Sequence, residues 1–122
     1  GSGPLRLSKL TVLHHAAIDG AAFNLLWNFS NVNQNEAVGR GAIELTNVLH
    51  TNLSSRLKSQ HNEIRDHYMK QCLNALAEGS KSQDEKAKLL VSRSIFRIKN
   101  FLEGFSRKLK KKTLRLKVNP SV

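Results

Sequence analysis

The first long stretch of the chain, residues 8–31, is apolar on almost every face of a helix. A helix that is apolar nearly all round is typical of a central, buried helix in a soluble protein. A polar run over residues 31–35 then interrupts this pattern, and Asn33 or Asn35 is suited to cap the next helix. We therefore predict a first helix over residues 8–31 that is the most buried element of the fold.

Two apolar stripes with helical spacing come next. Apolar residues recur every three or four positions from Val38 to Leu57, and again from Ile64 to Leu76. The residues between the two stripes are rich in Ser, Asn and His, which have modest helix propensity. We expect a break near residues 58–62. The alternative is one uninterrupted helix, because no Gly or Pro lies within residues 42–78.

The last helix has both a predicted start and a predicted packing face. Gly79 suits the position just after a helix, and Ser82-Gln83-Asp84-Glu85 has the S-x-x-E form of a capping box. Beyond it, apolar residues are spaced in heptads: Val91, Ile95, Ile98, Leu102, Phe105 and Leu109. We expect this seam, with Ile95, Ile98 and Leu102 at its centre, to be buried against the first helix.

The two ends of the chain are assigned by composition. Gly1-Ser2-Gly3 resembles a cloning remnant, and we place residues 1–7 in this remnant and an N-terminal tail. Residues 113–118 alternate apolar and basic side chains as a strand does, and a short ribbon with Leu5-Arg6-Leu7 is the alternative. Because a lone two-stranded ribbon is marginal in water, residues 113–122 are assigned to a basic C-terminal tail. The remaining residues, 8–112, form the predicted domain. Its fold class is all-α, an antiparallel bundle of about four helices with a long basic C-terminal helix.

Composition supports one soluble domain with an uneven charge. The 122 residues are 39% hydrophobic, which is enough to bury a core. No apolar run is long enough to predict a transmembrane segment. The chain has 20 Lys+Arg and 9 Asp+Glu, a net charge of +11. Thirteen of the basic and three of the acidic residues lie in residues 81–122. Such a concentration of positive charge destabilises a compact state by self-repulsion and indicates an anionic partner.

The basic side chains of the last helix are the candidate interaction residues. We expect them on the face opposite the apolar seam, exposed to solvent, and a rise of about 1.5 Å per residue spreads them over the scale of several phosphates or headgroups. They are Arg93, Arg97, Arg107, Lys108, Lys111 and Lys112.

The leading functional hypothesis is a non-catalytic interaction domain that binds a protein with an acidic or amphipathic surface through this helix. Binding to nucleic acid or to an anionic membrane is the alternative, for which Phe96 is the aromatic residue off the seam. A secreted, cytokine-like helical ligand is a second alternative. It is disfavoured because such bundles have long crossover connections and the gaps here are short. A purely solvated charged face is the simplest interpretation of the same residues. Neither the partner's identity nor the oligomeric state follows from the sequence.

No pattern of residues indicates catalysis or a bound cofactor. Glu63 and His67 are four positions apart and could offer two metal ligands, but nothing supplies the third and fourth. The chain has no Gly-rich phosphate loop, no G-x-S-x-G and no H-E-x-x-H. We predict no enzyme activity, no metal and no cofactor. Cys72 is the single cysteine, predicted to be buried; an unpaired cysteine fits a reducing, intracellular location, cytoplasmic or nuclear.

Overall fold

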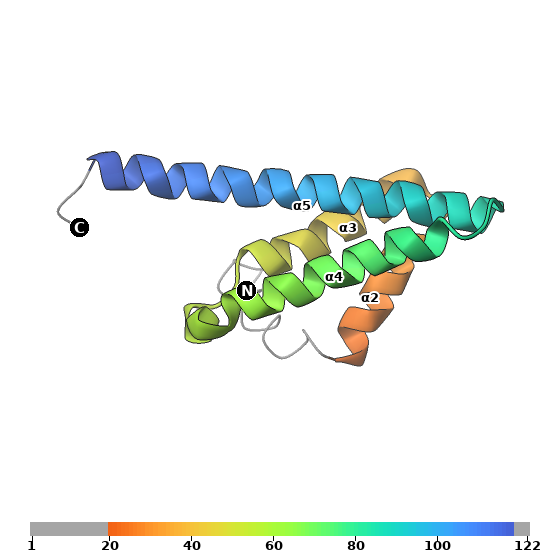
Figure 1. Cartoon of the computed structure of the whole chain (residues 1–122), viewed down its shortest axis with the longest axis horizontal. Helices are drawn as coiled ribbons and strands as arrows, with labels where there is room; N and C mark the ends of the chain where they lie inside the picture. Colours follow the sequence, from red (N-terminus) through yellow and green to blue (C-terminus); the bar gives the residue numbers. More distant parts are fainter. Residues whose placement is uncertain (1–19, 119–122) are drawn as a thin grey trace, which may run out of the picture.

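The structure is a bundle of helices arranged along one long helix (Figure 1). It is a computed structural model that describes residues 20–118. In this range it contains α2 (Ala21–Val32), α3 (Glu36–Thr51), the short 3-10 helix η1 (Ser55–Gln60), α4 (His61–Gly79) and α5 (Glu85–Val118). The predicted all-α class is confirmed, and no strand occurs in this part of the chain. The predicted N-terminal tail and the first turns of the predicted first helix lie outside the described residues.

The helix boundaries before α4 follow the predicted breaks. Asn35 caps α3, because its side-chain oxygen accepts a hydrogen bond of 3.0 Å from the Val38 N–H. The expected break exists, but it begins earlier than the predicted residues 58–62: α3 ends at Thr51, η1 covers Ser55–Gln60, and α4 begins at His61. The Ser54 side chain accepts a bond from Arg56 N at the start of η1. The alternative of a single helix over residues 36–78 is therefore wrong.

The turn between α4 and α5 corrects two local predictions. Asp84, not Ser82, caps α5: its Oδ1 accepts a 2.8 Å bond from Ala87 N, which is the main reason that the pKa of Asp84 is lowered. Gly79 is the last residue of α4 rather than a residue beyond it, and its φ is not positive. A Cβ at Gly79 would lie 2.9 Å from Val91 Cγ2, so glycine allows α4 and α5 to approach closely at this end.

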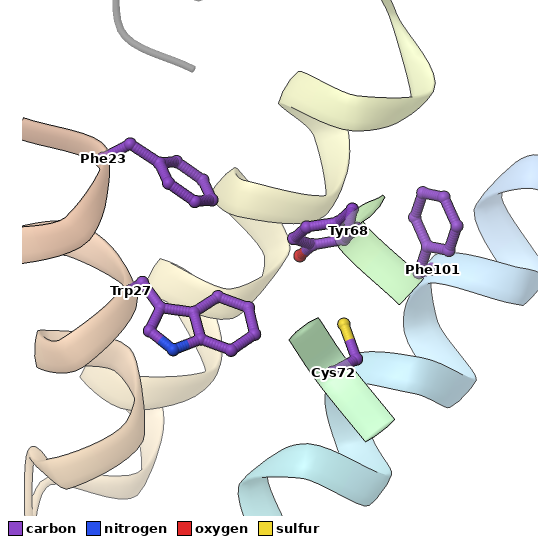
Figure 2. Close-up of a cluster of buried hydrophobic side chains, with 5 residues drawn as sticks. All are labelled: Phe23, Trp27, Tyr68, Cys72 and Phe101. Atoms are coloured by element: carbon purple, nitrogen blue, oxygen red, sulfur yellow. The ribbon is translucent and has the colours of Figure 1, made fainter. Parts of the chain in front are cut away.

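Aromatic side chains from three helices form the apolar core (Figure 2). Phe23 and Trp27 of α2 and Phe101 of α5 surround Tyr68 of α4. The Tyr68 ring meets those of Trp27 and Phe101 edge to face, with centroids 6.0 and 5.3 Å away. Cys72 is fully buried in this core, as predicted, and burial raises the pKa of its thiol to about 11.

The predicted seam of α5 is not its packing face. Ile95 and Leu102 are 54% and 51% exposed, so their expected burial is wrong, and Ile98 is only partly buried against the core. The buried positions of α5 are Arg93, Ser94, Arg97 and Phe101. Apart from the adjacent pair Arg93 and Ser94, they are three or four residues apart, so they lie on one side of the helix. This arginine-bearing side, rather than the predicted apolar seam, faces the bundle.

A similar exchange of polar and apolar positions occurs in the other helices. In α3, Val38 and Leu45 of the predicted stripe are exposed, whereas Thr46 and Asn47 are buried. In α2, Leu25 is 71% exposed, so the prediction that the first helix is buried on most faces is wrong for the part that the structure describes. The interior therefore holds many polar groups, and much apolar surface faces outward.

The last part of α5 extends beyond the bundle. In Figure 1 its C-terminal turns project past the ends of α3 and α4. The helix continues through residues 113–118, so the strand-like interpretation of this stretch is wrong, and Gly104 does not end the helix. We call residues 106–117 the basic arm. All of its side chains are exposed.

Candidate interaction surface

The six candidate cations divide into two groups with different surroundings. Arg93 and Arg97 are 0% and 1% exposed. The other four, Arg107, Lys108, Lys111 and Lys112, are exposed. The expectation of a continuous solvent-facing row is therefore wrong for the two arginines in the first half of α5. Arg107 and Lys111 lie on the same side of α5 as these two arginines, and they are exposed because they lie toward the C-terminal end of the helix, which extends beyond the bundle (Figure 1).

Arg97 joins all four helices through neutral acceptors. Its Nη2 donates to the Ser30 hydroxyl and, at 3.0 Å, to Asn31 Oδ1, both on α2. Its Nη1 donates to the Thr46 hydroxyl on α3 and lies 3.3 Å from the Tyr68 hydroxyl on α4. The guanidinium also lies over the Trp27 ring, 4.0 Å from its centroid. Charge-assisted bonds and a cation–π contact thus offset the cost of burying this charge.

The arginine also connects to the tyrosine at the centre of the core. The Tyr68 hydroxyl donates to Asn47 Oδ1 at 2.5 Å, and Asn47 Nδ2 donates to the Arg97 carbonyl at 3.0 Å. Burial raises the pKa of Tyr68 to about 12, against the smaller opposing effect of the Arg97 charge. Every step of this network lies inside the bundle, so its role is to hold the helices together.

Arg93 holds the turn between α2 and α3. Its Nη1 donates to the Ser30 carbonyl at 2.8 Å, and its Nη2 donates to the Asn33 carbonyl at 2.6 Å. These acceptors are at the C-terminal end of α2, where cations are favoured by the helix dipole. Nη2 also reaches Glu36 Oε2 at 3.3 Å, an ion pair whose acidic side is half exposed. The pKa of Glu36 is lowered, mainly by its bond from Arg40 and further by Arg93.

Heptad analysis could not find this polar interior, because it counts only apolar residues. A signal was nevertheless present: Ser30, Thr46 and Asn47 lie within otherwise apolar helices, where unpartnered polar groups are costly to bury. Two arginines one helical turn apart on α5 could have supplied their partners. Recognising that pairing requires the register between helices, which the sequence alone does not reveal.

A cluster of cations marks the place where α5 leaves the bundle. Lys108 donates to the Thr51 carbonyl at the end of α3, and Arg65 of α4 donates to the carbonyls of Thr51 and His50 at 3.2 and 3.1 Å. The Arg65 guanidinium also lies over the Phe105 ring. Partial burial is the main reason that the pKa of Lys108 is lowered, and the charges of Arg65 and Lys112 lower it further. Lys108 is therefore partly structural, although it begins the exposed basic arm.

The basic arm carries the strongest exposed charge of the described chain. It contains seven Lys or Arg and no acidic residue in twelve positions: Arg107, Lys108, Lys110, Lys111, Lys112, Arg115 and Lys117. None of them forms an ion pair with the described residues. Three exposed leucines, Leu109, Leu114 and Leu116, lie among them. The arm therefore combines uncompensated charge with accessible apolar surface.

Comparison with known proteins adds no functional information. No protein-family model matches the chain, and neither the curated proteins nor the solved structures yielded a similar protein. Across residues 20–118, no helix combines the length and apolar character needed to cross a membrane. The same residues contain no group of three His, Cys, Asp or Glu side chains placed to hold a metal ion. The basic arm is the candidate site because of its exposed, uncompensated charge and its exposed leucines.

Proposed function

We propose that the protein is a non-catalytic interaction domain that binds an acidic protein surface through the basic arm. The observation that carries the proposal is the position of the arm's charge. Seven cations in residues 106–117 have no carboxylate partner within residues 20–118, and all but Lys108, which bonds to Thr51, are free of such a bond to the bundle, whereas the two arginines that the bundle itself needs are buried in it. A cationic surface of this kind attracts anionic partners and raises their rate of association.

The side chains of the arm favour a protein partner over nucleic acid. Stacking of bases on aromatic rings is a main source of affinity for single strands, and the arm contains no aromatic residue. It instead exposes leucines: Leu109 is 49% exposed and Leu114 is 62% exposed. A phosphate backbone has no apolar surface against which these leucines can be buried, whereas an acidic protein surface with apolar residues can bury them. Phe96 does not change this argument, because it is partly buried beneath Arg40, whose guanidinium lies 4.6 Å from the ring centroid.

A charge-removal experiment with a matched control tests the proposal. The arm variant replaces four exposed cations with Gln: Arg107, Lys111, Lys112 and Arg115. The control variant removes the same charge from exposed lysines elsewhere: Lys70, Lys81, Lys86 and Lys88. Lys108 is kept in both because it bonds to Thr51. Each exposed ion pair contributes about 0–1 kcal/mol, so four together should change affinity by roughly tenfold or more.

The assay is affinity capture from lysate, with and without nuclease, at increasing salt. We expect acidic proteins to survive nuclease treatment on the wild type and the control variant, and to be lost from the arm variant. Capture of nucleic acid alone, abolished by nuclease, would overturn the proposal in favour of the nucleic-acid alternative. Equal capture by the two variants would show that the arm is only a solvated surface.

A further inference from the structure

The apolar residues that the bundle leaves uncovered on α5 form a regular line. Ile95, Leu102, Leu109 and Leu116 are each separated by seven residues and are 54%, 51%, 49% and 52% exposed. We call these four residues the outer stripe. Seven residues correspond to almost two full turns, so the four side chains lie along one side of the helix over about 32 Å.

We propose that the outer stripe is the docking face for an acidic amphipathic helix of a partner protein, which packs against α5 as in a coiled coil. This inference rests on the proposed function and specifies the form of the partner. Val91, Ile98 and Phe105 occupy the other apolar positions of the heptad and are partly buried by the bundle. One row of apolar residues on α5 therefore packs against the bundle, and the other row, the outer stripe, is left exposed and can contact a partner helix.

The narrowness of the stripe favours a helix over a membrane surface. An interfacial helix needs a broad apolar face, whereas a coiled-coil seam is a narrow stripe, of which the outer stripe supplies one of the two apolar positions in each heptad. Lys110 and Lys117 follow directly after Leu109 and Leu116, while Lys108 and Arg115 directly precede them. Consecutive residues differ by about 100° around a helix, so each of the two leucines has cations on both sides. Insertion of this face into lipid would bring charges on both sides into the acyl region.

Charge also decides between an acidic partner and a second copy of the chain. α5 contains twelve Lys or Arg and two acidic residues, Glu85 and Glu103. Two copies of α5 packed along the outer stripe would place cations against cations in either orientation, which opposes pairing. A helix with Leu at its seam and Glu at the flanking positions matches the apolar line and the cations beside Leu109 and Leu116.

The test uses two synthetic peptides of equal composition. The heptad peptide has about 28 residues, four heptads, with Leu at the seam and Glu at the flanking positions, so that its own charge opposes self-association. The scrambled peptide keeps the composition and destroys the heptad spacing. The stripe variant of the protein carries Ile95→Gln, Leu102→Gln and Leu109→Gln. Its control replaces exposed apolar residues of α2 and α3, with Leu25→Gln, Val32→Gln and Val38→Gln.

Binding is measured by fluorescence anisotropy of the labelled peptides, with circular dichroism to confirm folding of each variant. We expect the heptad peptide to bind the wild type about tenfold more tightly than the scrambled peptide, because only the former can bury the stripe. The stripe variant should lose this preference and the control should keep it. Leu109→Gln alone, in the projecting arm where the fold does not depend on it, should lose part of the preference.

The failures of the two proposals are distinguishable. Equal binding of both peptides, weakened only in the arm variant, would overturn the docking face and leave the proposed function intact. No binding of either peptide, together with equal capture by the arm variant and its control in the lysate assay, would overturn both. A wild-type protein that sediments as a dimer and becomes monomeric in the stripe variant would show that the occupant is a second copy.

Discussion

Two glycines of α3, two residues apart, should respond to alanine with opposite signs. A Cβ added at Gly39 would overlap the Arg93 guanidinium: the Nη2 atom would lie 2.7 Å from it, and the other guanidinium atoms near it would be closer still. A Cβ added at Gly41 would have no atom within 4 Å. The guanidinium is the end of a flexible side chain, but it is fully buried and bonded to the carbonyls of Ser30 and Asn33. It can move away from the added methyl group only by giving up those bonds.

The magnitude follows from the bonds that are lost. A hydrogen bond to a charged group contributes about 1.5–3 kcal/mol, and two such bonds join Arg93 to the end of α2. Part of this loss is offset, because alanine stabilises a helix by up to about 1 kcal/mol relative to glycine. We therefore expect Gly39→Ala to lower the free energy of unfolding by roughly 2–5 kcal/mol. Gly41→Ala changes only the helix propensity, so it should raise the free energy of unfolding by about 0.5–1 kcal/mol.

Urea denaturation followed by far-ultraviolet circular dichroism measures both changes. The cause is tested by repeating Gly39→Ala in an Arg93→Met background, where most of the loss should disappear because the clashing group is gone. The reasoning is refuted if Gly39→Ala is as stable as Gly41→Ala. It is also refuted if the loss is the same with and without Arg93.

Two further predictions test the core. Phe101→Ala should lower the free energy of unfolding by about 3–5 kcal/mol and the neighbouring Leu102→Ala by less than about 1 kcal/mol; similar losses would contradict the packing of the arginine-bearing side of α5 against the bundle. Tyr68 is the only tyrosine of the chain, and its pKa of about 12 lies above the ordinary value of about 10. The folded state thus binds this proton more tightly than the unfolded state, so the contribution of Tyr68 to stability is complete below a pH of about 10 and declines as the pH rises toward about 12. Phenolate absorbance in the near ultraviolet should show a midpoint at a pH of about 12 in native protein and of about 10 in urea. A native midpoint close to the lower value would contradict the burial of Tyr68.

The helices and some of their boundaries could be predicted because local chemistry determines them. The Asn35 cap and the break before α4 depend on residues close in sequence. The side of each helix that faces inward depends instead on partners far along the chain. A heptad of apolar residues on α5 predicted burial of Leu102, but the polar groups of α2 and α3 pair with Arg93 and Arg97, and these bonds place the arginines inside. The concentration of charge on α5 was therefore visible in the sequence, whereas the division of its cations between interior and surface was not.

Because some cations of α5 are buried and others are exposed, the net charge of the chain overstates the charge that a partner can contact. Charge counted along the sequence treats Arg97 and Lys112 alike, yet only the second can meet a partner. The excess that remains accessible is concentrated in the basic arm, where like charges stand four residues apart in the pairs Arg107–Lys111 and Lys108–Lys112. Such pairs destabilise an isolated helix, although cations near its C-terminus are favoured by the dipole. A bound acidic partner would relieve the repulsion and cover the leucines, so stability of the arm and affinity for the partner depend on the same residues.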